Sequence, residues 1–297
     1  MIRNEDRLKE LISDSDPKET MKNNIVKGNQ LITARYNLGM AELRIINLAI
    51  AKKGAFDNSH GYMCISAEDY AKAYGVHRNT AYEALEMATT TLFDKRFSYK
   101  QKGFLSSETT VITSRWLQSI ARSSTEMKIY LKFSDDVLQM IDHLQDNFTK
   151  YKFKMITQFT SIYSTRLYEI FSSWVSVGKM PLVTVEELRF SLDIESEYNR
   201  LESLKRCVLE PAIKEINLKS DLKVSYTQEK RGRKVVGFLF KVSRKRKNKA
   251  LEAINDGVEM TATGVDEYMK DFEKYNSGKK TNQPTAISEI LASIKPR

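Results

Sequence analysis

The residues best placed to do chemistry are cations near the C-terminal end of the sequence. Positions 223–249 hold eleven Lys or Arg residues and one Glu. Four of these cations surround Gly232: Lys230, Arg231, Arg233 and Lys234. Alternating apolar residues precede and follow them, a pattern that predicts a β-hairpin with a cationic turn. Such a turn suits contact with phosphates along a nucleic-acid backbone. The alternative interpretation is a solvated charge cluster.

A second group lies on the helix that the sequence predicts over 198–216. Its buried side is formed by Leu201, Leu204, Val208 and Ala212 if each residue turns the helix by about 100°. The opposite face then carries Asn199, Ser203, Arg206 and Glu210, with Arg200 and Lys205 on the flanks. Asn pairs with adenine and Arg with guanine in the major groove, while flanking cations suit phosphates. The alternative is an amphipathic surface helix with solvated charges.

Two further residues of this helix carry structural predictions. Cys207 lies beside the buried side, so we expect it in the core. Pro211 lacks an amide donor, so we expect a kink or break there, with 212–218 as a separate turn.

Composition and charge narrow the class of partner. The chain has 297 residues, is 41% hydrophobic and carries a formal net charge of +10. This excess favours nucleic acid first and an anionic membrane surface second, although charge can also serve solubility alone. The most apolar stretch, 45–51, is too short to span a bilayer, so we expect no membrane partner. Two distant cysteines and a charged N-terminus without an apolar stretch favour a cytoplasmic protein.

The chain repeats one pattern with an offset of 118 residues. Ser66 with Asp69 and Thr184 with Glu187 both have capping-box spacing. Each pair follows a helical pattern and precedes a second helix and strand-like runs. The order helix, strand, helix, helix, hairpin predicts an α+β protein with two tandem winged-helix domains. The alternative is two unrelated domains with accidental similarity.

The predicted organisation has five parts. They are a flexible arm (1–24), an N-terminal winged-helix domain (25–133), a connecting helical segment (134–162), a C-terminal winged-helix domain (163–248) and a tail (249–297) with short helical patterns at 251–256 and 265–275.

The helix-turn-helix of the first copy is less suited to reading bases. Its second helix, predicted over 79–93, directs Glu83 outward, where phosphates would repel it. Arg78 at the helix start can still contact backbone. We therefore expect the second domain to read sequence and the first to pair with a second subunit. Five other cations of the first copy are equally suited to phosphate and to solvent: Lys95, Arg96, Lys100, Lys102 and Arg115.

The sequence offers no catalytic set. His60, His77 and His143 are remote from one another, and neither a Walker-type phosphate loop nor a metal-ligand spacing occurs. We therefore expect no metal, no cofactor and no enzymatic activity. A DNA-processing enzyme stays open only as a hypothesis that metal-dependent nicking of a supercoiled origin would revive.

The ordered blocks resemble one known family, the theta-type plasmid replication initiator Rep proteins. The resemblance rests on ITARYNLGMAELRIINLAI (32–50), YGVHRNTAYEAL (74–85), FSY…ITSRW (97–116), YSTRLYEIFSSW (163–174), LKRCVLEPAIKEIN (204–217) and KRGRKVVGFLFK (230–241). It spans about 24–246. It implies two winged-helix domains, the C-terminal one reading repeated origin sequences called iterons. By position, Arg200, Ser203, Lys205 and Arg206 match the reader helix of the family.

The resemblance also implies partners. These are double-stranded origin DNA with direct repeats, a homodimer in equilibrium with the monomer, a host initiator and a replicative helicase, all met on plasmid DNA in the bacterial cytoplasm. It implies repression of the protein's own gene by the dimer. A dedicated winged-helix transcriptional repressor remains the alternative, since direct repeats favour initiation and an isolated inverted repeat favours repression.

Overall fold

The computed structural model describes residues 20, 23–52, 61–102, 109–123, 125–141 and 147–245. The predicted tail with its two helical patterns, and nearly all of the predicted arm, lie outside these residues. No helix in the described ranges is both long and apolar enough to cross a membrane.

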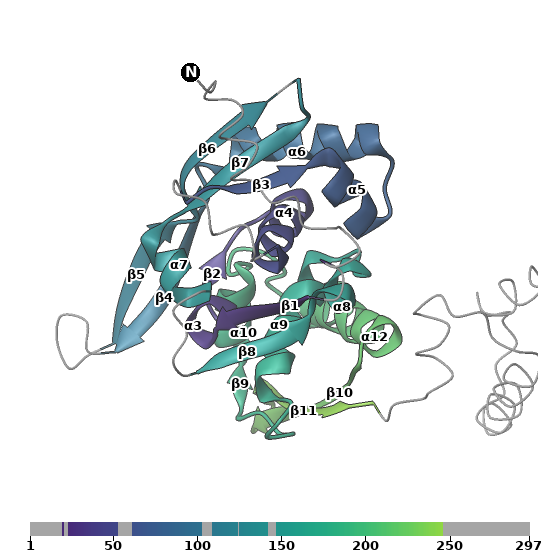
Figure 1. The fold of residues 1–297 in the computed structure, drawn as a ribbon. Coiled ribbons are helices and arrows are strands. Elements are labelled where there is room, and N and C mark those ends of the chain that lie inside the picture. The colour runs from purple at the N-terminus through teal and green to yellow at the C-terminus, as the bar shows by residue number, and fades with distance from the viewer. Residues whose placement is uncertain are drawn as a thin grey trace, which may run out of the picture. The chain divides into compact units, whose positions relative to one another are not determined.

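The N-terminal part contains a winged helix with an additional hairpin. Its elements are β1 (Asn24–Gly28), α3 (Asn29–Ile32), β2 (Arg35–Tyr36), α4 (Met40–Ala51), β3 (Met63–Ser66), α5 (Ala67–Tyr74), α6 (Arg78–Leu92), β4 (Arg96–Lys102), β5 (Thr109–Arg115), β6 (Leu117–Ser123) and β7 (Lys128–Phe133). β6 and β7 form an antiparallel hairpin that pairs with β3 (Figure 1). β4 and β5 form a second hairpin on β2, so the strand-like runs of this copy belong to two sheets.

The segment expected to connect the domains differs from the prediction. Residues 134–162 were expected to be helical, but α7 (Asp135–Ile141) and α8 (Phe153–Thr157) flank a strand, β8 (Phe148–Lys152). β8 pairs antiparallel with β1 over five residues. The helical expectation is wrong there because buried Thr149 and Tyr151 alternate with exposed neighbours, which is a strand period.

The C-terminal part repeats the winged-helix order. Its elements are α9 (Ile162–Trp174), β9 (Val183–Thr184), α10 (Val185–Leu192), α11 (Leu201–Leu204), the π-turn η2 (Lys205–Leu209), α12 (Glu210–Lys219), β10 (Leu222–Arg231) and β11 (Lys234–Arg244). Its sheet has the order β10-β11-β9, which matches β6-β7-β3 in the first copy. Gly237 makes the β9–β11 pairing possible, because a Cβ there would lie 2.4 Å from the carbonyl oxygen of Val183. The predicted pair of winged helices is confirmed.

The local signals of the repeat are confirmed at the predicted offset. The Ser66 hydroxyl accepts a bond from the Asp69 amide at 3.0 Å, and the Thr184 hydroxyl accepts one from the Glu187 amide at 3.1 Å. Each box begins the first helix of a helix-turn-helix, α5 or α10. Both helices end in a left-handed residue, Gly75 and Asp193, which are again 118 positions apart.

The two copies share one continuous apolar core. Buried side chains run from Ile25 to Val242 in a single cluster. α4 is almost fully buried, since it packs on β1, β3 and α6. α9 is buried from Ser164 to Ser172 because it contacts β8 and α3 of the N-terminal part as well as α12 and β10 of the C-terminal part. The domains are therefore joined by packing rather than by a free linker.

Candidate nucleic-acid interface

The wing of the second domain presents its cations to solvent. Arg231 pairs with Lys234 at the end of the hairpin, and Gly232 turns the chain with φ of 60°. Lys230, Arg231, Arg233 and Lys234 are all exposed. None of the four forms an ion pair with any residue that the structure describes. Their positive charge is therefore available to a polyanion.

The predicted reader helix begins later than expected. α11 starts at Leu201, with Arg200 as its N-cap residue. Asn199 was predicted on the outward face of the helix, and it lies in the preceding loop instead. Arg189 holds this loop, because its guanidinium donates to the carbonyl oxygens of Glu197, Tyr198 and Asn199 at 2.9, 2.6 and 3.2 Å. Asn199 and Arg200 are nevertheless exposed at the helix entrance.

The other predicted reader residues differ in their exposure to solvent and in their contacts with acidic side chains. Arg206 is exposed, and no ion pair to it occurs within the described residues. Ser203 is half-buried. Lys205 lies 3.9 Å from a carboxylate oxygen of Glu210, which also accepts a bond from the Tyr226 hydroxyl at 3.2 Å. Of the neighbouring cations Lys205 and Arg206, Arg206 is therefore the one whose charge no described residue engages.

The middle of the helix departs from α geometry. Residues Lys205–Leu209 form a π-turn, in which the Glu210 amide donates to the carbonyl oxygen of Lys205 five residues back. Cys207, predicted in the core, is exposed. That prediction is wrong because the π-turn adds one residue and turns Cys207 away from the core. The break expected at Pro211 occurs one turn earlier, and Pro211 lies in the first turn of α12, where its missing amide is tolerated.

The corresponding helix of the first domain fits the sequence prediction. α6 buries Ala81, Leu85, Ala88 and Leu92 and leaves Arg78 and Glu83 exposed. Two cations near it are engaged by acids, since Lys95 lies 3.7 Å from Glu42 and Arg115 lies 3.2 Å from Asp94. Lys100 packs over the ring of Phe190. Arg96 and Lys102 are exposed. This surface offers fewer free cations than the second domain does.

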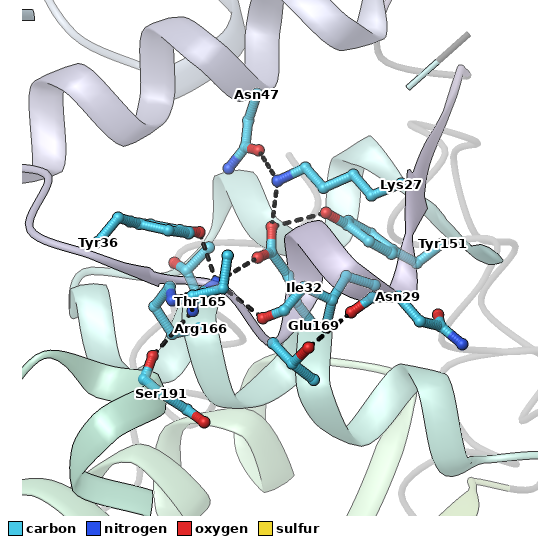
Figure 2. A network of polar contacts seen from close by, with 12 residues as sticks. Lys27, Asn29, Ile32, Tyr36, Asn47, Tyr151, Thr165, Arg166, Glu169 and Ser191 are labelled. Carbon is cyan, nitrogen blue, oxygen red and sulfur yellow. Dashed lines mark hydrogen bonds and ion pairs between the residues drawn. The ribbon is translucent and has the colours of Figure 1, made fainter. Parts of the chain in front are cut away.

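A buried polar network fixes the second domain to the first (Figure 2). Glu169 on α9 accepts bonds from the Lys27 ammonium on β1 and the Tyr151 hydroxyl on β8, both at 2.7 Å. Lys27 also donates to the Asn47 side chain at 2.7 Å. Lys27 and Glu169 are almost completely buried, at 1% and 0% exposure of their side chains.

Arg166, one turn earlier on α9, connects three further elements. Its guanidinium donates to the carbonyl oxygens of Ile32, Ala34 and Ser191 at 3.1, 2.7 and 2.9 Å and stacks on the ring of Tyr36 at 3.8 Å. The α9 helix is thereby tied to α3, to β2 and to the end of α10 (Figure 2).

The ionisation of this network is set by competing effects. Burial alone would raise the pKa of Glu169, but the charges of Lys27 and Arg166 outweigh burial and lower that pKa below its ordinary value. Burial lowers the pKa of Lys27, which Glu169 opposes. We infer that Glu169 is ionised where its oxygens lie 2.7 Å from Lys27 and 3.5 Å from Arg166, so this junction holds a buried carboxylate between two basic side chains. Sequence reasoning missed it, because only folding brings positions 27 and 169 together.

No group of three or more His, Cys, Asp or Glu side chains that could hold a metal ion occurs among the described residues. What the surface of the second domain offers is an exposed cationic hairpin beside a helix whose entrance carries Arg200 and whose middle carries Arg206. Such an arrangement defines a tandem winged-helix protein of the nucleic-acid-binding kind.

Comparisons with known proteins assign the family. Residues 24–172 match the family of the initiator replication protein, WH1, and residues 184–242 match the initiator Rep protein, WH2. The chain belongs to this family of replication initiators, which confirms the resemblance seen in its sequence blocks. Both matched domains are described as those of a replication initiator and not as those of an enzyme, as predicted.

Individual relatives agree with this assignment. A replication initiation protein of Escherichia coli is 27% identical over 229 residues, which cover 73% of this chain and 69% of that protein. An uncharacterized 27.6 kDa protein of Escherichia coli is 25% identical over 232 residues, covering 73% of this chain and 93% of the relative. The Pi initiator protein, solved in complex with iteron DNA, has the same fold with a TM-score of 0.63, 24% identity and coverage of 76% of this chain and 99% of that one.

Proposed function

We propose that this protein initiates plasmid replication by binding directly repeated origin DNA through its second winged-helix domain. The observation that carries the proposal is the group of exposed cations on adjacent elements: Arg200, Arg206, Lys230, Arg231, Arg233 and Lys234. Arg206, together with Ser203 and Asn199, reads base edges in the major groove. Arg200, Lys205 and the wing bind phosphates and fix the register. The related Pi initiator, whose structure contains iteron DNA, supports this arrangement.

The proposal is tested with the DNA that flanks the gene. A duplex carrying one direct repeat from this DNA and a scrambled duplex of equal composition are titrated with the protein at several salt concentrations. Specific recognition requires tighter binding of the repeat, typically by a factor of about 10³–10⁷. Equal binding of both duplexes at every salt concentration would contradict specific reading by this chain.

Arg206→Ala tests the reading face. A bidentate arginine–guanine contact discriminates by about 1–3 kcal/mol, so the variant should bind the repeat about 5- to 150-fold more weakly and lose preference at one base position. A set of duplexes with single base changes measures this preference. Lys223→Ala is the control, since Lys223 is an exposed cation at the start of β10, at the opposite end of that strand from the wing turn. Unchanged affinity and preference in Arg206→Ala would remove Arg206 from the reading face.

For the first domain we propose backbone contact through Arg78 and dimerisation through β5. β5 pairs with β4 on one side, and no other described strand pairs with its second side. Its sequence from Thr109 to Ser114 is uncharged and rich in β-branched residues, and Val111 is 55% exposed. An edge strand of this composition is suited to pairing with the same strand of a second copy.

Val111→Lys tests this edge. A lysine on each of two paired edges adds like charges and hydration, so the dissociation constant of the dimer should rise at least about tenfold, which corresponds to about 1.4 kcal/mol. Sedimentation across a concentration series measures it. Val177→Lys is the matched control, because Val177 is also an exposed valine, at 65%, and lies outside any described strand. A dimer that is equally stable in both variants would place dimerisation elsewhere.

The remaining steps rest on the family alone. We propose that the bound protein promotes opening of the origin, recruits the host initiator and the replicative helicase in the cytoplasm, and represses its own gene as a dimer. A dedicated repressor with the same fold is the alternative. The two differ in an assay of plasmid maintenance, since a repressor is dispensable for replication and an initiator is not.

A further inference from the structure

The π-turn at Lys205–Leu209 lies in the middle of the proposed reader helix, and its position follows from how the helix is buried. Counted at about 100° per residue from Leu204, the buried residues before Leu209 centre near 20° and those from Leu209 onward near 130°. The first set is Leu204 and Val208, and the second is Leu209, Ala212, Ile213 and Ile216. The two centres differ by about 110°, close to the ~100° of one residue.

One additional residue therefore joins two halves that each bury their own stripe. α12 is held by its packing on α9 and β10, which fixes the second half. A regular helix of this sequence would turn either Leu204 and Val208 or Ile213 and Ile216 out of the core. Pro211 also favours the π-turn, because it lacks the amide that a regular helix would pair with the carbonyl oxygen of Cys207.

The additional residue emerges on the solvent side. Arg206 and Cys207 are both exposed, whereas the same turn in a regular helix would leave Cys207 beside the buried stripe. The exposed residues that follow, Glu210, Pro211 and Lys214, continue this outward face along α12. Single π-turns inside helices are rare and frequent at functional sites.

We propose that the π-turn is a positioning element for DNA reading. It sets the height and direction of Arg206 relative to the wing and adds Cys207 to the face that enters the groove. This inference rests on the proposed function of the second domain. Its physical basis is that a residue adds about 1.5 Å of rise in a helix, a displacement sufficient to break a bidentate bond to a base edge.

The first test removes the π-turn without removing the core. Deleting Cys207 and replacing Pro211→Ala brings Leu204, Leu209, Ala212 and Ile216 into one stripe about 60° wide in a regular helix, with Val208 and Ile213 each about 40° outside its two edges. We expect this variant to fold, with a far-ultraviolet circular dichroism spectrum close to that of the wild type. It should also bind a scrambled duplex as the wild type does. Its preference for the origin repeat over the scrambled duplex should fall at least about tenfold. Cys207→Ala keeps the length of the helix, so it should lose less of this preference than the deletion does.

A folded deletion variant with undiminished preference would overturn the proposal, because the π-turn would then only accommodate Pro211. If the wild-type protein itself shows no preference for the origin repeat over the scrambled duplex, the proposed function is contradicted, and the role of the π-turn is not what has failed.

A second test uses the wild-type chain and does not depend on the folding of a variant. Cys207 is exposed and Cys64 is buried, so a bulky thiol reagent labels position 207 first. With the protein saturated, the origin repeat should slow labelling of Cys207 at least about tenfold more than the scrambled duplex does. Equal labelling rates in the two saturated complexes would show that the π-turn stays outside the groove and would overturn the proposal.

Discussion

Glu169→Gln will lower the free energy of unfolding by about 3–5 kcal/mol, the usual effect of removing one partner from a buried ion pair. The side chain of Glu169 is completely buried and accepts a bond from the equally buried Lys27 at 2.7 Å. Glutamine keeps the size and part of the hydrogen bonding but not the charge. Lys27 and Arg166 would then stay in the core without the carboxylate that offsets the cost of their burial. Urea denaturation followed by circular dichroism measures the loss.

Two companion variants separate charge from packing. Glu186→Gln makes the same substitution at an exposed position of α10 and should change the free energy by less than about 0.5 kcal/mol. Lys27→Met combined with Glu169→Gln removes one of the two basic side chains that the single change leaves without the carboxylate, so the double variant should be more stable than the sum of the two single effects. Additive effects of the two substitutions would mean that the charges do not act on each other.

Replacing all four wing cations, Lys230, Arg231, Arg233 and Lys234, with alanine will weaken binding to every duplex. Each cation that neutralises a phosphate contributes about 0.9 to the slope of log affinity against log salt. The slope should therefore become shallower by up to about 3.6, while the preference for the repeat over a scrambled duplex stays nearly unchanged. Fluorescence anisotropy at 50–200 mM salt measures both quantities.

A matched loss of charge elsewhere is the control for the wing. Lys150 and Lys152 are exposed on β8, and their replacement with alanine removes two positive charges far along the chain from the wing. The comparable wing variant is Arg231→Ala with Arg233→Ala. If both pairs flatten the salt slope equally, net charge and not the wing accounts for the affinity.

Local signals in the sequence were sufficient for most of the fold. The capping boxes at Ser66 and Thr184 act within four residues, so their hydrogen bonds form as the spacing predicts. The wing was predictable for the same reason, since Gly232 and the alternation around it are local. The order of these local elements was enough to predict two winged helices.

The errors arise where distant residues decide. The single residue added at η2 changed the exposure of Cys207, and it depends on the packing of α12 against α9 and β10. β8 became a strand because β1, more than 100 residues earlier, supplies its partner. The cluster of Lys27 and Glu169 could not be inferred from spacing. Arg166 and Glu169 within an apolar helix were the available signal, since two charges on a buried helix need partners.

The double membership of α9 limits how such a protein can be cut and recombined. α9 is the first helix of the second winged helix, where Phe171 packs on Phe240, and it also carries Arg166 and Glu169 into the first. A fragment that begins after Trp174 would lack α9 and therefore part of the hydrophobic core of the second winged helix. A chimera that borrowed only the reading half of a relative would need that relative's β1 and β8 as well, so the natural unit of exchange is the whole stretch from 24 to 245.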